Sequence, residues 1–288
     1  MLKHRLITGS LLVLLLIILA TVDQSATGGQ SFLARGVLLM IVCCLVAVPL
    51  LALELTTILR RLDSRASGWI SAVGASLLCF TMWLSAAPGY EESRLINQLP
   101  GLVLAGVFAV AFIDACIGRR TQGVVTEVAG TLFAVLYGGG FMGFWLMLRQ
   151  DASAWMIMGA ILTVKMGDIG AYTVGCSIGR TRLIPWLSPK KTWEGLLGGI
   201  VFAMVSGGLL AWAGQDIQGV GSSVSIGTGV AFGFLAAWVG LLGDLIASAI
   251  KRDAAIKDSS RILPGLGGLV DTLDSLLLTG PLAWLMLG

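Results

Sequence analysis

The chain has 288 residues, of which 56% are hydrophobic and only 12% charged, and its formal net charge is +3 at pH 7. Because soluble domains contain about 45–50% apolar residues, this composition excludes an ordinary water-soluble globular protein. The single histidine, His4, lies in the N-terminal tail, which nearly excludes chemistry that depends on a histidine base or ligand. Carboxylates, cations, hydroxyls and bound metal remain as the candidates for chemistry.

Apolar runs long enough to cross a bilayer recur along the whole chain. A transmembrane helix needs roughly 20 mostly apolar residues. The sequence predicts nine such helices, at about residues 6–22, 33–53, 69–87, 101–117, 129–148, 154–176, 195–213, 227–250 and 273–287. The expected fold class is therefore an all-α polytopic membrane protein. The 39 glycines are typical of helices that pack closely in lipid.

The first apolar run follows a basic start, Lys3-His4-Arg5, as in a cleaved signal peptide. Its apolar stretch is long for a signal peptide, and Ser25-Ala26-Thr27 is a weak cleavage site. We therefore expect this run to be an uncleaved membrane anchor.

The distribution of lysine and arginine predicts the orientation. When the predicted loops are taken alternately, most of the 19 basic residues fall on the side of the N-terminus, and only Arg35, Arg94 and Arg149 fall on the other. Because basic loops face the cytoplasm, the N-terminus is expected there. We expect an integral protein of the bacterial inner (plasma) membrane with its polar motifs facing the cytoplasm. Five loop cations are interpreted only as topology signals, namely Arg60, Arg61, Arg65, Arg119 and Arg120.

The charged motifs gather in the C-terminal half. We therefore divide the chain into an N-terminal transmembrane helical region, 1–150, and a C-terminal transmembrane region, 151–288, that carries the motifs. A transporter built from inverted repeats would carry such motifs in both halves, so this distribution argues against one. Membrane lipid is the expected environment, and no nucleic-acid partner is expected.

The first motif places two opposite charges inside an apolar helix. Lys165 and Asp168 are three residues apart, so they could pair with each other. Such a pair could fix helix packing, or Asp168 could reach a polar cavity. Gly170, Gly175 and Gly179 would let another helix or a ligand approach closely.

The second motif is Ser188-Pro189-Lys190-Lys191-Thr192-Trp193-Glu194-Gly195. Proline is favoured at the first position of a helix, so the motif predicts a helix that begins at Pro189 with Ser188 as its cap. Lysines in the first turn oppose the helix dipole unless an anion binds there, and phosphate is the natural anion. The alternative is a basic loop held by anionic lipid headgroups.

The third motif lies between Gly243 and Ser275 and is rich in carboxylates and cations. Asp244, Ser248 and Lys251 would share one helix face, and Asp271 and Asp274 would share another. Such a cluster is costly beside membrane helices unless it binds something charged. The pattern favours a metal-assisted phosphate site, whereas helix capping would account for one of the last two aspartates at most.

Together these segments resemble the phosphatidate cytidylyltransferases (CDP-diacylglycerol synthases), over about residues 165–280. The matching residues are Ser248-x-x-Lys251-Arg252, Lys257-Asp258, Pro264-Gly265-x-Gly267-Gly268, Asp271-x-x-Asp274, Asp168-x-Gly170-Ala171-Tyr172 and the second motif above. The resemblance implies a nucleotidyltransferase that converts CTP and phosphatidate into CDP-diacylglycerol and pyrophosphate, in phospholipid biosynthesis.

The resemblance also implies roles for particular residues. Mg²⁺, with a second cation as an option, would be held by Asp244, Asp271 and Asp274. The catalytic set would be Asp244, Lys251, Arg252, Asp271 and Asp274. The substrate and phosphate contacts would be Ser188, Lys190, Lys191, Ser248, Lys257, Asp258, Gly265, Gly267 and Gly268, with Asp168 as a further candidate.

Two positions depart from the family pattern. Leu266 stands where the family usually has a histidine, and Thr272 where it usually has an arginine. This leaves open an active subfamily with other donors, a related activity such as a CTP-dependent lipid kinase or another lipid phosphotransferase, and a catalytically impaired homologue. A membrane transporter is the alternative outside enzymes, and a homodimer is left open as the assembly.

Overall fold

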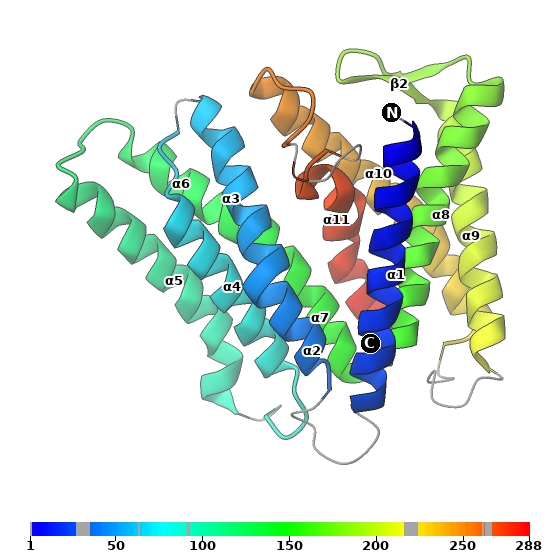
Figure 1. The fold of residues 1–288 in the computed structure, drawn as a ribbon, viewed down its shortest axis with the longest axis horizontal. Coiled ribbons are helices and arrows are strands. Elements are labelled where there is room, and N and C mark those ends of the chain that lie inside the picture. Colours follow the sequence, from blue (N-terminus) through cyan, green and yellow to red (C-terminus); the bar gives the residue numbers. More distant parts are fainter. Residues whose placement is uncertain are drawn as a thin grey trace. The chain divides into compact units, whose positions relative to one another are not determined.

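The computed structural model describes residues 2–26, 35–62, 64–90, 93–215, 224–260, 262 and 267–288 (Figure 1). Most of them are helical, which confirms the expected all-α class. The structure divides into two compact units. The first contains Met1–Gln150 and Asp253–Thr272, and the second contains Asp151–Arg252 and Leu273–Gly288.

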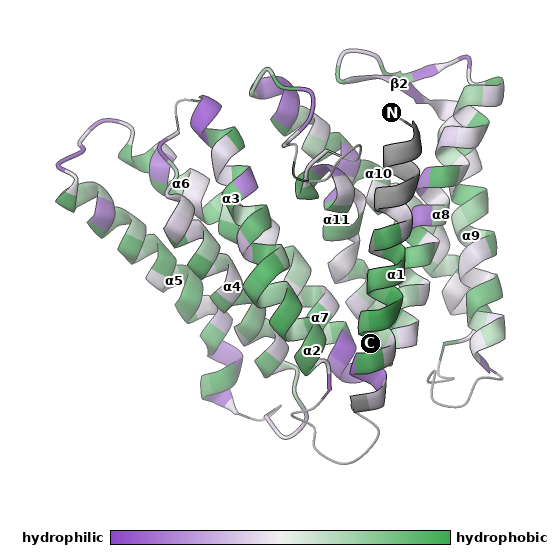
Figure 2. Cartoon of the chain, in the orientation of Figure 1, coloured by the Kyte–Doolittle hydropathy of each residue, from purple (hydrophilic) through white to green (hydrophobic). Residues whose placement is uncertain are grey.

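Eight helical segments in the described part of the chain are long and apolar enough to cross a membrane. Hydrophobic residues run along these helices, and hydrophilic ones gather at many of their ends (Figure 2). The eight segments are Val37–Leu62, Gly68–Ser85, Arg94–Ile117, Val124–Asp151, Ala154–Ile178, Trp193–Gln215, Ile226–Asp253 and Leu269–Leu287. They correspond to the last eight of the nine predicted spans. The predicted first span lies in α1 (Leu2–Ala26), whose apolar part, Gly9–Ser25, is shorter than these, so the ninth span and the orientation stay predictions.

Most of the first unit is formed by segments α1 to α7. After α1 these are α2 (Val37–Val42), η2 (Cys43–Ala47), α3 (Val48–Leu59), η3 (Arg60–Leu62), α4 (Gly68–Ser85), α5 (Arg94–Ile117), α6 (Val124–Ala134), η4 (Val135–Gly140) and α7 (Phe141–Asp151). Fully buried side chains such as Leu51, Leu55 and Leu146 form its core. The backbone of η4 packs directly on α4, because a Cβ at Gly139 would overlap the backbone of Ala75.

A buried ion pair ties α1 to the rest of the first unit. Arg149 Nε of α7 donates to Asp23 Oδ2 at 2.7 Å, and both side chains are at most 3% exposed. The backbone N–H of Leu39 in α2 donates to the other oxygen of Asp23. These contacts make α1 a packed element of the first unit, and the uncleaved anchor stays a prediction.

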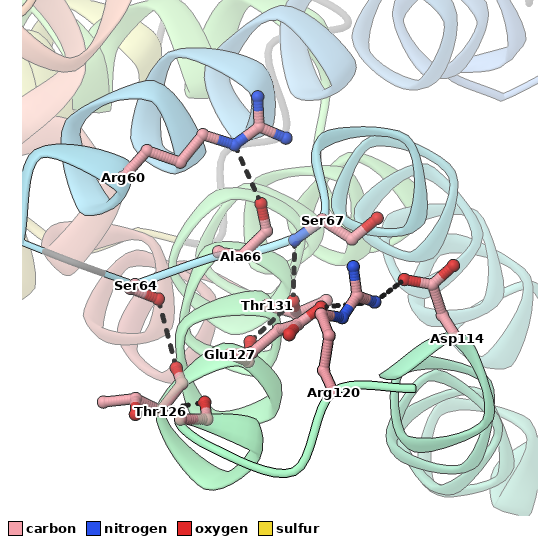
Figure 3. A network of polar contacts seen from close by, with 10 residues as sticks. Arg60, Ser64, Ala66, Ser67, Asp114, Arg120, Thr126, Glu127 and Thr131 are labelled. Carbon is pink, nitrogen blue, oxygen red and sulfur yellow. Dashed lines mark hydrogen bonds and ion pairs between the residues drawn. The ribbon is translucent and has the colours of Figure 1, made fainter. Parts of the chain in front are cut away.

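A second polar network joins the segment between η3 and α4 to the start of α6 and the end of α5 (Figure 3). Arg120 Nη2 lies 2.6 Å from Asp114 and 3.0 Å from the buried Glu127. Ser64 donates to the Thr126 carbonyl, and the N–H of Ser67 donates to the Thr131 hydroxyl. Arg120 therefore has a structural role as well as the topological one predicted for it.

The second unit contains α8 (Ala154–Ile178), β1 (Arg182–Ile184), β2 (Ser188–Thr192), α9 (Trp193–Gln215), α10 (Ile226–Asp253) and most of α11 (Leu269–Leu287). The strands β1 and β2 pair antiparallel, with Arg182 opposite Thr192 and Ile184 opposite Ser188. Glycines bring α8 and α9 close together, since a Cβ at Gly170 would collide with Phe202 and one at Gly198 with Val174. At Gly170, the close approach that the sequence predicted is therefore made by a helix of the same unit.

Candidate active site

The candidate residues are distributed over both units. Asp168, Asp244, Asp274 and the residues of the β1–β2 hairpin belong to the second unit, whereas Gly268 and Asp271 belong to the first.

In the second unit, α8 and α11 meet in a closed set of polar contacts. Lys165 Nζ donates to Asp168 Oδ2 at 3.1 Å and to Ser275 Oγ at 2.9 Å, and Ser275 Oγ donates to Asp168 Oδ2 at 3.0 Å. The predicted pairing of Lys165 with Asp168 is confirmed. Ser275 also donates its backbone N–H to Asp274 Oδ1 at 2.6 Å, so this serine connects the two aspartates.

Asp274 is 9% exposed, and its carboxylate interacts electrostatically with Asp244, Lys165 and Asp168. The helices α10 and α11 touch at this level, because a Cβ at Gly243 would overlap the Asp274 carbonyl oxygen. A glycine next to Asp244 thus allows the backbones that carry Asp244 and Asp274 to approach closely.

Asp244 has partners from two elements. Lys191 Nζ of β2 lies 2.7 Å from its Oδ2, and Ser248 Oγ donates to its Oδ1 at 3.4 Å. The Ser248 contact, one helical turn along α10, confirms that Asp244 and Ser248 share a face. Lys251 and Arg252 follow in the last turn of α10, where cations interact favourably with the helix dipole.

The predicted helix start at Pro189 is wrong. Ser188–Thr192 forms strand β2, and α9 begins at Trp193. The cap is Thr192, whose Oγ1 accepts from the N–H of Gly195 at 3.1 Å. The predicted cap, Ser188, instead pairs with Ile184 of β1. Lys190 is exposed on this strand and does not lie in the first turn of a helix. The prediction that a helix dipole and Lys190 together bind phosphate is therefore wrong.

The hairpin is fixed to α9 by Glu194. Its carboxylate accepts from the backbone N–H groups of Arg180 and Thr181 at 3.1–3.2 Å, and the Trp193 N–H donates to the Thr181 carbonyl at 3.0 Å. Glu194 therefore orients the segment that carries Lys190 and Lys191.

In the first unit, Asp271 holds together the residues that precede and begin α11. Its Oδ2 accepts from Ser259 N at 2.8 Å, Ser259 Oγ at 2.7 Å and Gly268 N at 3.1 Å. This is the capping role that the sequence left open for one of the two aspartates. Its assignment as a metal ligand stays a prediction. Thr272 donates its hydroxyl to the Gly268 carbonyl within the same turn.

A buried glutamate of α3 completes this helix start. Glu54 accepts from the backbone N–H groups of Leu269 at 2.8 Å and Val270 at 3.4 Å. A Cβ at Gly268 would overlap the Glu54 carboxylate and the Ser259 hydroxyl. Gly267, with φ of +98°, adopts a backbone conformation that favours glycine. Gly267 and Gly268 are thus explained by backbone geometry and close packing.

Three predicted substrate-binding residues remain: Lys257, Asp258 and Gly265. Lys257 and Asp258 are exposed on the segment between α10 and α11. Gly265, together with Pro264 and Leu266, lies outside the described residues.

The donors present suit a hard divalent cation. Within the described ranges, no three histidine, cysteine, aspartate or glutamate side chains converge as a metal site. Mg²⁺, however, commonly uses only one or two protein carboxylates, with substrate phosphates and water as its other ligands. The neighbouring carboxylates Asp244 and Asp274 provide that number.

Sequence reasoning missed Glu54, Thr192, Glu194 and Ser275. Glu54 had a usable signal, because a lone carboxylate in the apolar run Val48–Leu59 is costly in a membrane helix unless it has a partner. Ser275 had none, since its importance comes from a contact with α8 more than 100 residues away.

The comparisons with known proteins cover most of the chain. The cytidylyltransferase family model matches residues 3–288. The phosphatidate cytidylyltransferase of Mycobacterium bovis is 31% identical over 244 residues, which cover 80% of this chain and 75% of the relative. That of Thermotoga maritima is 32% identical over 193 residues, or 67% and 71% of the two chains, and that of Synechocystis is 34% identical over 192 residues, or 56% and 62%. The chain therefore belongs to the cytidylyltransferase family.

Proposed function

We propose that the chain transfers a cytidylyl group from CTP to phosphatidate in phospholipid biosynthesis. The observation that carries this function is the family match across residues 3–288, together with relatives named phosphatidate cytidylyltransferase over most of the chain. The membrane-spanning helices agree with a lipid substrate.

The reaction requires no strong protein base. A phosphate oxygen of phosphatidate, already anionic near neutral pH, attacks the α-phosphorus of CTP. A new P–O bond forms, the bond to the β-phosphate bridging oxygen breaks, and pyrophosphate leaves with that oxygen. Catalysis then depends on aligning two anions and on neutralising the charge that they bring together.

The second unit supplies groups of the required charge. Asp244 and Asp274 would hold Mg²⁺, and Asp168 lies in the same cluster. When bound, Mg²⁺ would neutralise charge on the nucleotide phosphates. Lys191, already within 2.7 Å of Asp244, would contact a phosphate oxygen at the edge of this cluster. Further phosphate contacts would come from Ser188, Lys190, Ser248, Lys251 and Arg252.

The start of α11 belongs to the first unit. Asp271 and Glu54 fix that helix start by accepting five hydrogen bonds between them. Lys257 is exposed on the preceding segment and would meet a phosphate group, with Asp258 orienting a neighbouring cation. We propose that the protein resides in the bacterial inner membrane with this chemistry on the cytoplasmic side, where CTP is found. A homodimer is one assembly to be tested.

The test is incorporation of label from CTP into lipid by the purified protein in phosphatidate-containing vesicles. Label on the α-phosphate should enter lipid in the presence of Mg²⁺ and fail to enter when EDTA removes it. Label on the γ-phosphate should appear in pyrophosphate. Entry of the γ-label into lipid would identify a CTP-dependent lipid kinase instead, and no incorporation of either label would show an impaired homologue.

A further inference from the structure

A charged pair lies near the middle of α8, one of the helices long and apolar enough to cross a membrane. Lys165 is the twelfth residue of the 25-residue helix Ala154–Ile178, about 17 Å along its axis. An ammonium group in the middle of a membrane-spanning helix is costly unless it has a polar partner. The side chains of Lys165 and Asp168 are 34% and 46% exposed. We therefore infer that their open side faces polar groups, since lipid tails could not solvate them.

The pair is connected to α11 through one buried serine. Ser275 is 1% exposed, accepts from Lys165 and donates to Asp168 with its hydroxyl, and donates to Asp274 with its backbone N–H. A lysine that only neutralised Asp168 would need no such contact. The arrangement instead links the conformation of Asp274 to that of the α8 pair.

The charges of the cluster favour a cation. Asp274 interacts electrostatically with Asp168 and with Asp244. The ammonium groups of Lys165 and Lys191 lie beside Asp168 and Asp244, respectively. Two lysines offset two of the three negative charges if all three carboxylates are ionised. One negative charge then remains, and removing the charge of Lys165 would leave two negative charges to attract a divalent cation.

We propose that Lys165 and Ser275 are positioning residues for cytidylyl transfer, which hold Asp168 and Asp274 in place and set the affinity of the cluster for Mg²⁺. The proposal rests on the function proposed above. Under this proposal, Lys165 does more than fix the packing of α8, because it also orients the reacting groups. Ser275 likewise does more than fill space in α11.

The experiment compares Lys165→Met, Lys165→Arg and Ser275→Ala with wild type as purified full-length protein in lipid nanodiscs. The matched control is Thr279→Ala, one turn further along α11, because the Thr279 hydroxyl is also buried but donates only to carbonyls of its own helix. Two quantities are measured: the steady-state constants of cytidylyl transfer, and the Mg²⁺ concentration that gives half of the Mg²⁺-dependent rise in thermal unfolding temperature.

We expect Lys165→Met and Ser275→Ala to lower kcat by about tenfold to hundredfold, the effect of misplaced reacting groups, with a smaller change in KM for CTP. The Mg²⁺ midpoint should fall in Lys165→Met, because an unbalanced carboxylate attracts the cation more strongly. It should rise in Ser275→Ala, because Asp274 is less well fixed. Lys165→Arg should keep the Mg²⁺ midpoint near that of wild type, and Thr279→Ala should leave both quantities unchanged.

Unchanged kcat and unchanged Mg²⁺ midpoints in Lys165→Met and Ser275→Ala would overturn the proposal. The contact between Lys165 and Ser275 would then serve only the packing of α8 against α11. If Lys165→Met does not fold, the kcat and the Mg²⁺ midpoint of Ser275→Ala are compared with those of Thr279→Ala. Equal values in these two variants would overturn the proposal. A wild-type protein without transfer activity would contradict the proposed function, whereas the Mg²⁺ midpoints would still decide whether Lys165 and Ser275 set the cation affinity.

Discussion

Lys191 of the β1–β2 hairpin and Asp244 of α10 form an ion pair, with Nζ 2.7 Å from Oδ2. The Lys191 side chain is 18% exposed, whereas its neighbour Lys190 is exposed on the same strand. The two adjacent lysines therefore differ in environment: Lys191 is largely buried in an ion pair, and Lys190 is exposed to solvent. Only Lys191 is positioned to act directly on the charge of a carboxylate that we propose as a metal ligand.

The first prediction separates these two lysines. Lys191→Gln should lower kcat/KM for cytidylyl transfer by about tenfold or more, because it removes a charge beside Asp244 and a phosphate contact together. Lys190→Gln should raise KM for CTP or phosphatidate with a smaller effect on kcat, because its ammonium group is solvated. Steady-state kinetics of both variants test this. Equal losses in the two variants would show that the ion pair with Asp244 is not used.

The second prediction compares the two aspartates of α11. Asp274→Asn should abolish Mg²⁺-dependent CTP incorporation while the protein still folds, because Asp274 has a neighbouring carboxylate to share a cation with. Asp271→Asn should lower both activity and stability, because the Asp271 oxygen accepts three hydrogen bonds that order the helix start. Thermal unfolding alongside activity distinguishes the two. A stable, active Asp274→Asn variant would exclude Asp274 as a metal ligand.

The sequence was sufficient for the helical membrane class because apolar runs of fixed length have few alternatives in a bilayer. It also predicted the Lys165–Asp168 pair and the shared face of Asp244 and Ser248, since both follow from the helical repeat. These are contacts between residues three or four positions apart.

The sequence was not sufficient where a partner comes from another element. Pairing with β1 places Ser188–Thr192 in a strand and moves the helix cap to Thr192, although Ser188-Pro189 is also a good helix start. The contacts of Glu54 with α11 and of Ser275 with α8 join residues more than 100 positions apart. Hydrophobic periodicity carries no information about such pairs.

The third prediction concerns the close packing at Gly268. Gly268→Ala should destabilise the protein and lower activity, because the added Cβ would overlap the Glu54 carboxylate and the Ser259 hydroxyl. Gly227→Ala is the matched control, since a Cβ there would meet only the Ser225 hydroxyl at an ordinary contact distance. Thermal unfolding in nanodiscs measures both. If Gly268→Ala is as stable as Gly227→Ala, the glycine is not required by the contact with Glu54.

The last prediction concerns the ion pair between α1 and α7. Asp23→Asn should destabilise the protein by about 3 kcal/mol, because it leaves the Arg149 guanidinium buried without its charged partner. Thr21→Ala is the control, since the exposed Thr21 hydroxyl donates only to a carbonyl of its own helix. Denaturation in mixed micelles measures the difference.

The same pair predicts that α1 stays attached to the folded protein. Loss of α1 would remove the Asp23 carboxylate from Arg149, so cleavage would carry a free-energy cost comparable to that of Asp23→Asn. The intact mass of protein purified from membranes should therefore include residues 2–26. A mass that lacks them, together with a stable Asp23→Asn variant, would show that Arg149 is satisfied without α1.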